Sequence, residues 1–191
     1  MGALRVLGVD PGTQVFGWSV LEGRAGQPPA RVDSGACSLG DSKVPIPRRL
    51  ERLRQELLGL VQAWKPGFVA VEAAFFGKNA RSALRLGEAR GVILVTALEA
   101  GLEVVELPPA QVKRRVAGSG AATKEQVGRL AALQLGLTGE FASPDESDAV
   151  AVALCALLEA DNPDGLRGTR ESIGNPGPRL SSSIPPGALP Q

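Results

Sequence analysis

Residues 4–21 read LRVLGVDPGTQVFGWSVL, and this stretch decides the fold class. An apolar run, Leu4–Val9, ends at Asp10 and is followed by Pro-Gly-Thr, three residues typical of a turn. A second run rich in β-forming residues extends from Val15 to Leu21. The pattern predicts a β-hairpin that leaves an aspartate at the end of its first strand.

The segments after the hairpin predict a mixed α/β domain. A third strand is expected at 30–39, and leucines at helical spacing between Pro47 and Trp64 predict an amphipathic helix. A short apolar strand at 68–71 ends at Glu72. Beyond it we expect a helix at 79–99, a strand at 104–107, and helices at 109–116, at 123–134 and from Ser143. This order predicts a mixed five-stranded sheet flanked by helices, with antiparallel strands first and parallel crossovers later.

Composition divides the chain into two parts. Residues 161–191 contain six Pro, five Gly and four Ser and no aromatic residue. Such a segment cannot bury enough apolar surface to offset its chain entropy. We therefore expect one folded domain over residues 1–160 and a disordered tail over 161–191.

Two residue types are absent, and their absence excludes several chemistries. The chain has no histidine and no tyrosine. A Ser-His-Asp triad, a histidine-ligated zinc site, a histidine-activated nuclease and a tyrosine-linked strand transferase are therefore excluded. The formal net charge of +1 neither requires nor excludes a nucleic-acid partner.

The cysteines and the apolar runs indicate the cellular compartment in which the protein is expected to work. Cys37 and Cys155 lie in hydrophobic surroundings without CxxC spacing, which predicts buried, reduced thiols and a cytoplasmic protein. No apolar run approaches the roughly eighteen residues of a membrane span, and the N-terminus does not resemble a signal peptide. We therefore expect no membrane association.

Four carboxylates occupy positions where the chain is expected to converge. Asp10 and Glu72 each end a predicted strand, and Asp145 and Asp148 lie on one face of the first turn of the last helix. Clustered carboxylates repel one another, and bound divalent cations are the usual compensation. Two such ions can activate a water and stabilise the departing oxygen of a phosphodiester. The set suits two Mg²⁺ ions, with Mn²⁺ as an alternative.

Each of these acids also has a structural interpretation. Asp145 lies within Ser-Pro-Asp-Glu, residues 143–146, a capping box in which acids are favoured by the helix dipole. Asp148 is open to the same interpretation, and Asp10 precedes Pro-Gly and can be a turn former. Glu72, after four apolar strand residues, has no evident structural role.

Basic and acidic residues are segregated along the chain. Nine Lys or Arg against five Glu occur between Lys78 and Arg129, whereas residues 140–164 hold seven acids and no base. The predicted phosphate-binding residues are Lys113, Arg114 and Lys124, which flank the Gly-rich stretch 118–122. A charge run is also compatible with an ordinary solvated face.

Two aromatic residues follow Glu72 directly. Phe75 and Phe76 are compatible with core packing, but a ring in a loop beside a metal site can also stack on DNA bases. Lys78 completes the set of candidate DNA-binding residues.

Four segments together resemble the RuvC family of crossover junction endodeoxyribonucleases. They are LGVDPGT, VEAAFFGKNARSALRLGEARGV, PPAQVKRRVAGSGAATKEQV and SPDESDAVAVALC, in order and spacing from about residue 4 to 158. The resemblance implies a ribonuclease-H-like fold and a nuclease that resolves four-way (Holliday) junctions in recombination and repair.

The same resemblance implies roles for individual residues. It makes Asp10, Glu72, Asp145 and Asp148 the catalytic metal ligands, with Phe75 against junction bases and Lys113 and Lys124 near the scissile phosphate. It also implies a homodimer that nicks opposed strands and works with a branch-migration motor. Some members have histidine where Asp145 stands, so an all-carboxylate site is expected here. The Gly/Pro/Ser-rich tail and Gly77 depart from the family pattern.

Three other functions compete with junction resolution. An ATP-binding protein of the sugar-kinase and actin superfamily also begins with a strand and a DxGT loop, but it needs two such domains. A module that binds branched DNA without cutting gains nothing from added negative charge near phosphates. A related nuclease with ribonuclease H or transposase activity would use the same carboxylates.

The predicted helix at 79–99 is the candidate dimer interface. Ala83, Gly87 and Gly91 recur at i+4 spacing and permit close helix approach, with apolar area from Leu86, Val92 and Leu94. The alternative is that this helix buries those residues against its own sheet.

Overall fold

The structure is a computed structural model, and it describes residues 3–24, 27–73 and 80–160. Over these residues the chain forms, in order, β1 (Leu4–Asp10), β2 (Val15–Gly23), β3 (Ala30–Ser38), α1 (Ile46–Trp64), β4 (Phe68–Glu72), α2 (Ala80–Glu99), β5 (Glu103–Leu107), α3 (Pro109–Ala117), α4 (Lys124–Gln134) and α5 (Pro144–Ala160). The predicted order of strands and helices is confirmed. Asn79 and the tail at 161–191 lie outside the described residues.

The five strands form one mixed sheet in the order β3-β2-β1-β4-β5. β1 pairs antiparallel with β2, and β2 with β3, whereas β4 runs parallel to both β1 and β5. Antiparallel strands therefore come first and parallel crossovers later, as predicted. This is the ribonuclease-H-like arrangement.

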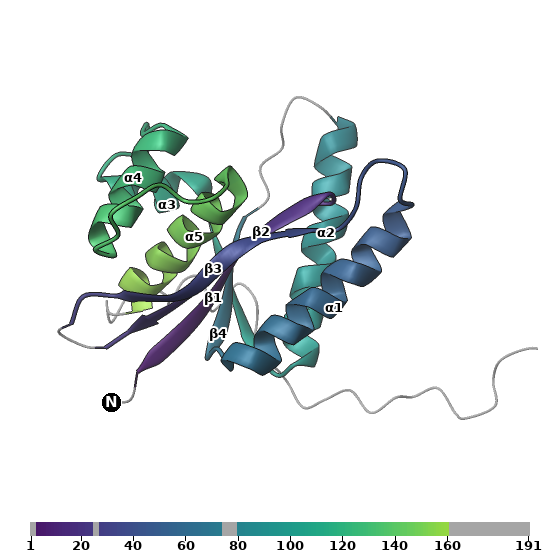
Figure 1. Ribbon diagram of the computed structural model, residues 1–191, viewed down its shortest axis with the longest axis horizontal. Coiled ribbons are helices and arrows are strands. Elements are labelled where there is room, and N and C mark those ends of the chain that lie inside the picture. The colour runs from purple at the N-terminus through teal and green to yellow at the C-terminus, as the bar shows by residue number, and fades with distance from the viewer. Residues whose placement is uncertain (1–2, 25–26, 74–79, 161–191) are drawn as a thin grey trace, which may run out of the picture.

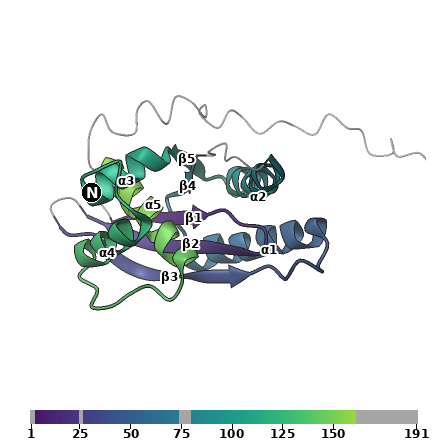
Figure 2. The ribbon, with the colours of Figure 1, turned by 90° about the horizontal axis from the view of Figure 1, so that it is seen from above.

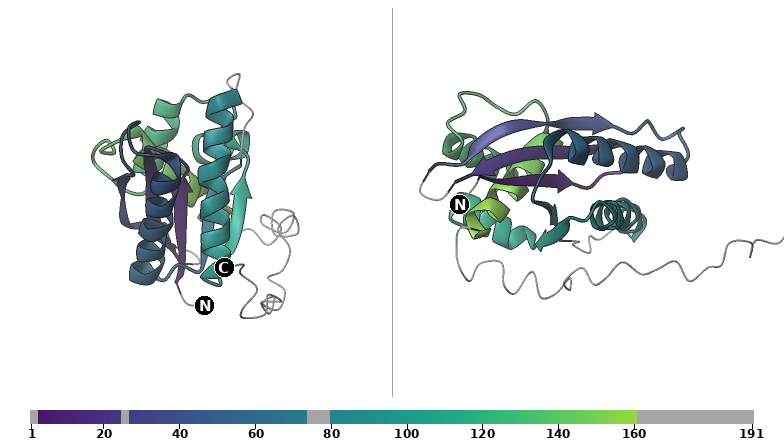
Figure 3. Two further views of the ribbon diagram at one scale, coloured as in Figure 1. Left: turned by 90° about the vertical axis from the view of Figure 1, so that its right-hand side faces the viewer. Right: turned by 90° about the horizontal axis from the view of Figure 1, so that it is seen from below.

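Helices cover both faces of the sheet. Figures 1 and 2 show α1 and α2 on one side and α3, α4 and α5 on the other. Because side chains alternate along a strand, Leu7 and Val9 of β1 pack in the core beneath α1 and α2, whereas Val6 packs on the opposite side. α1 and α2 run side by side (Figure 3, left).

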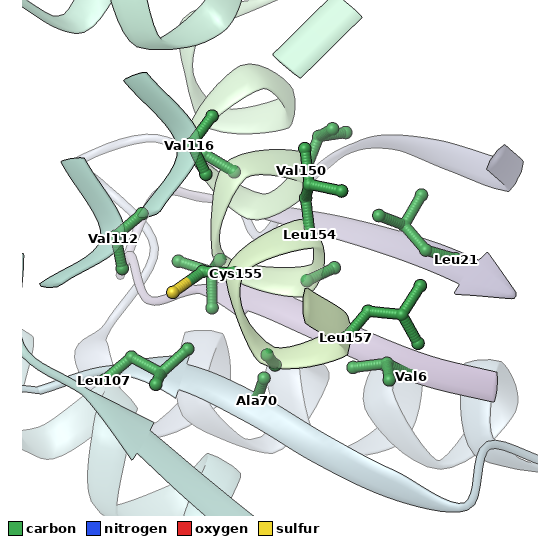
Figure 4. Packing of buried hydrophobic residues seen from close by; sticks show 14 of the residues in the cluster. Val6, Leu21, Ala70, Leu107, Val112, Val116, Val150, Leu154, Cys155 and Leu157 are labelled. Carbon is green, nitrogen blue, oxygen red and sulfur yellow. The ribbon is translucent and has the colours of Figure 1, made fainter. Parts of the chain in front are cut away.

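The most deeply buried helix is α5, which crosses the middle of the sheet. Every residue from Ala149 to Leu157 is buried. Figure 4 shows Cys155 of α5 facing Val112 of α3, while Leu154 lies on the side of the helix that faces Leu21 of β2. α5 is therefore rigidly fixed to β1 and β2 over most of its length.

The prediction of two buried thiols is only half right. Cys155 is buried and Cys37 is partly exposed, and both are free. Cys37 lies on the edge strand β3, where it packs against the core but stays only partly buried. Within the described part of the chain, no helix is both long enough and apolar enough to cross a bilayer.

Candidate active site

Asp10 and Glu72 end two adjacent parallel strands at the same level. Val9 of β1 pairs with Val71 of β4, and both valines pack beneath α1 and α2. The next residue on each strand therefore faces the opposite side, where α3, α4 and α5 lie. The two carboxylates emerge together at the carboxyl end of these strands.

Two glycines let α5 approach the sheet closely enough to reach this position. Gly17 of β2 is the pairing partner of Asp10, and a Cβ there would collide with the backbone carbonyl of Asp145. A Cβ at Gly8 would stand 2.5 Å from the Ala149 carbonyl oxygen. Direct backbone contact between α5 and two neighbouring strands thus sets the first turn of α5 over the end of β1.

The four carboxylates form one electrostatic unit. The pKa of Asp10 is raised from 3.8 to about 7, first by burial and then by the negative charges of Asp148 and Glu72, with a smaller contribution from Asp145. Burial and Asp148 also raise the pKa of Glu72. Asp148 therefore lies close enough to Asp10 and Glu72 to disfavour the charged form of both, and a convergence of carboxylates of this kind is typical of a site that binds a cation.

Two lysines balance part of this charge. Lys124 forms an ion pair with Asp148, and this hydrogen bond is the main reason that the pKa of Lys124 is raised. Lys113 lowers the pKa of Glu72 through its positive charge. Both lysines line, with Glu72 and Asp148, a pocket of about 40 Å³, which is larger than the roughly 10–15 Å³ that one water requires.

The donor set suits divalent ions such as Mg²⁺, which prefer carboxylate oxygens and retain several waters. Among the described residues, no three side chains of the usual ligand types lie close enough together to hold an ion in the present arrangement. Lys124 bonds to one Asp148 oxygen, which leaves the other oxygen of that carboxylate available to a cation.

Comparison with known proteins assigns the chain to a family. The sequence model of the crossover junction endodeoxyribonuclease RuvC matches residues 6–156. The chain belongs to the RuvC family. It is 44% identical over 154 residues to the RuvC of Pelobacter propionicus, covering 81% of this chain and 86% of that protein. It is 40% identical to the RuvC of Geobacter metallireducens, covering 87% of this chain and all of that protein.

A solved structure supports the same assignment. The RuvC of Thermus thermophilus in complex with a Holliday junction substrate superposes with a TM-score of 0.78 at 31% identity, covering 83% of this chain and 95% of that chain. Membership in the RuvC family makes this chain a crossover junction endodeoxyribonuclease. It also sets aside the ATP-binding and non-cutting alternatives.

The remaining predicted DNA-binding residues are Arg114, Phe75 and Lys78, and Arg115, next to Arg114, was not among them. Arg114 is exposed near the end of α3 but does not line the pocket that Lys113 and Lys124 share. Arg115 is engaged with Glu159 and the Leu158 carbonyl. The predictions for Phe75 and Lys78, like Phe76 and Gly77, lie outside the described residues.

The capping box predicted at the start of α5 forms only in part. The Ser143 hydroxyl accepts the Glu146 amide at 3.1 Å, as expected of an N-cap. The Glu146 carboxylate instead accepts the Ala142 amide at 2.8 Å and the Ser34 hydroxyl at 2.6 Å. A tertiary bond to Ser34 of β3 and a bond to the Ala142 amide thus replace the expected bond to the Ser143 amide.

Sequence reasoning missed three residues that shape the site. Gly8 and Gly17 lie inside strands, where glycine is unfavourable and signals close backbone approach. That signal was available in LGVD and FGW. Glu146 was interpreted only as part of a local cap, because its partner Ser34 is far away in the sequence.

Proposed function

We propose that this RuvC-family endonuclease cuts four-way DNA junctions with Asp10, Glu72, Asp145 and Asp148 as the ligands of two Mg²⁺ ions. The observation that carries the proposal is that Asp10 and Glu72 end adjacent parallel strands, while the start of α5, which carries Asp145 and Asp148, packs against Gly17, the strand partner of Asp10. When bound, two divalent ions would activate the attacking water and stabilise the departing 3′ oxygen. Nucleases of this family depend on metal ions, and the donor set here fits that requirement.

The lysines supply the complementary charge for the DNA. Lys113 and Lys124 line the pocket beside Glu72 and Asp148, so a phosphate entering there meets both ammonium groups. Lys124 pairs with Asp148, so its ammonium group lies beside a proposed metal ligand, where it could contact a scissile phosphate held next to the metal. Arg114, exposed on α3, would contact phosphate outside this pocket.

The residues that follow Glu72 in the sequence complete the proposed DNA contact. The resemblance to the family assigns Phe75 to junction bases, and Lys78 adds a positive charge to the same segment. The complex of the Thermus thermophilus protein with a Holliday junction substrate supports the junction as the substrate here.

We propose a homodimer that joins through α2. Gly87 and Gly91 are exposed, with open space where a Cβ would stand, so this helix does not bury them against its own sheet. Leu84, Val95 and Leu98 lie on the same outward face and are 70%, 56% and 45% exposed. By contrast, Val92 and Leu94, which we expected to supply apolar area, pack against the molecule's own core.

Two further parts of the proposal rest mainly on the family resemblance. A branch-migration motor is the expected partner, because a resolvase needs the junction to be brought to its cutting position. The DNA substrate and the two free cysteines support a cytoplasmic location.

The proposed function is tested by comparing the cutting of different nucleic-acid substrates with different metals. Purified protein is incubated with a mobile four-way junction, a linear duplex or an RNA–DNA hybrid, in Mg²⁺, Mn²⁺ or a chelator. We expect symmetrical nicks in the junction with either metal and none with the chelator. Preferential cutting of the hybrid would point to a ribonuclease H activity, and cutting in the chelator would exclude the metal site.

A further inference from the structure

Glu146 is a charged residue buried at the start of α5, only 4% exposed. It lies between two of the proposed metal ligands in sequence, yet both of its carboxylate oxygens are occupied. Oε1 accepts the Ser34 hydroxyl at 2.6 Å, and Oε2 accepts the Ala142 amide at 2.8 Å. Arg31 lies 3.7 Å from Oε1 and balances the charge. Glu146 is therefore not available as a metal ligand.

The bonds of Glu146 join three separate pieces of the molecule. They fasten the first turn of α5 to Ser34 on the edge strand β3, and to Ala142 in the segment that precedes the helix. Burying a carboxylate is unfavourable unless its oxygens are bonded, so these two contacts hold one another in place.

The first turn is the part of α5 that most needs this attachment. From Ala149 onward the helix is buried without interruption, whereas Asp145 and Ser147 are only partly buried. Asp145 also sits directly over Gly17, where its backbone contacts β2. Without Glu146, the turn would be held by the Ser143 cap, by this contact and by the ion pair of Asp148 with Lys124 of α4.

We propose that Glu146 is a positioning residue that fixes Asp145 relative to Asp10 through Ser34 and the Ala142 amide. The inference rests on the proposed role of Asp145 as a metal ligand. Outer groups that orient metal ligands typically change metal affinity by about 10–100-fold when they are removed. Glu146 acts on the backbone that carries the ligand instead of on the ligand's side chain.

Mn²⁺ binding to the full-length protein without DNA, measured by electron paramagnetic resonance, tests this role. We expect Glu146→Ala to raise the Kd for Mn²⁺ about tenfold or more. Glu146→Gln should stay within about threefold of wild type, since its amide can accept from Ala142 and donate to Ser34. Ser34→Ala, which removes one bond, should weaken binding by a smaller factor. Glu22→Ala, which breaks a 2.9 Å ion pair with Arg5 elsewhere on the sheet, is the matched control.

Each outcome decides the question. If Glu146→Ala lowers the melting temperature but leaves the Kd unchanged, or if the Gln variant is as weak as the Ala variant, the positioning role is wrong. Should Glu146→Ala fail to fold, an unchanged Kd in Ser34→Ala would overturn it. Asp145→Asn separates this inference from the proposed function: unaltered Mn²⁺ binding in that variant would remove the ligand assignment itself.

Discussion

The backbone carbonyl of Asp145 lies against the α-carbon of Gly17, at a point where any side chain on residue 17 would collide with it. Gly17 is also the strand partner of Asp10. One close contact therefore determines how far the first turn of α5 stands from the end of β1, and hence the separation of two proposed ligands.

Gly17→Ala should damage catalysis more than folding. The new methyl group must push the start of α5 outward, and overpacking of this kind costs about 1–3 kcal/mol. A displacement of about 1 Å in a reacting group can lower a rate about a hundredfold. We expect a folded protein whose junction nicking falls by about that factor, measured in single-turnover assays with gel-shift affinity alongside.

The matched control for that variant is Gly59→Ala on α1, where a Cβ would meet nothing within 4 Å. Alanine favours the helix there and should leave nicking unchanged. If Gly17→Ala nicked as fast as Gly59→Ala, the close contact would have no bearing on the site.

Metal-free protein should lose stability as pH rises, because of Asp10. Its folded-state pKa is about 7 against an ordinary value of 3.8, so the folded state retains a proton that the unfolded state releases. The contribution is present below about pH 4 and is lost as pH rises to about 7, on the order of a few kcal/mol in the free energy of unfolding. Asp10→Asn should remove the share of Asp10 in urea titrations with a chelator present and leave the share of Glu72, whose pKa is also raised by burial and by Asp148.

Added Mg²⁺ should change the stability of wild type and of Asp10→Asn by different amounts. It should stabilise the wild type at pH 8, because it binds only the folded state, and it should stabilise Asp10→Asn far less. If the stability of the two metal-free proteins depended on pH in the same way, the pKa of Asp10 would not be raised in the folded state.

Junction affinity should fall steeply with salt. If about six to ten phosphates are contacted, raising salt from about 50 to 200 mM should weaken binding about 10³–10⁵-fold. Lys113→Ala should flatten the slope of log affinity against log salt by about one. Arg24→Ala, at the opposite end of β1 and β2, is the control. An unaltered slope in Lys113→Ala would place that side chain away from the backbone of the DNA.

Gly87→Arg should give a folded monomer that makes uncoordinated nicks or none. A long charged side chain in the middle of the exposed α2 face would prevent two helices from approaching. Gly59→Arg, on an equally open helical surface, should remain dimeric. Analytical ultracentrifugation at micromolar concentration decides: a monomeric wild type, or a dimeric Gly87→Arg, would exclude this interface.

The parts of the fold that could be predicted from sequence depend on local pattern. Alternation and helical spacing located the elements, and the strand ends identified Asp10 and Glu72, because parallel neighbours end at the same edge of a sheet. The contacts of Glu146 with Ser34, and of Lys124 with Asp148, join residues far apart in the chain. No local pattern encodes such pairs, and the capping box at Ser143 was accordingly predicted in full but formed in part.

The exposed face of α2 is a second feature that the local sequence pattern could not predict. Small residues at i+4 spacing led us to predict an interface on this helix, which stays a prediction, and spacing alone could not say which side of the helix the sheet covers. The structure buries Ala89, Ile93 and Ala97 and leaves Gly87 and Gly91 outside.

The central claim is that the carboxylates of Asp10 and Glu72 bind the metal that supports junction cutting. It is tested most directly by comparing Asp10→Asn, Glu72→Gln and the control Glu22→Gln on a mobile four-way junction in Mg²⁺, with binding measured separately in Ca²⁺. Loss of a metal ligand should remove several kcal/mol of transition-state stabilisation. We predict that the two site variants bind the junction normally and nick it about a thousandfold more slowly or not at all, while Glu22→Gln nicks like wild type. Near-normal nicking by both site variants would contradict the account.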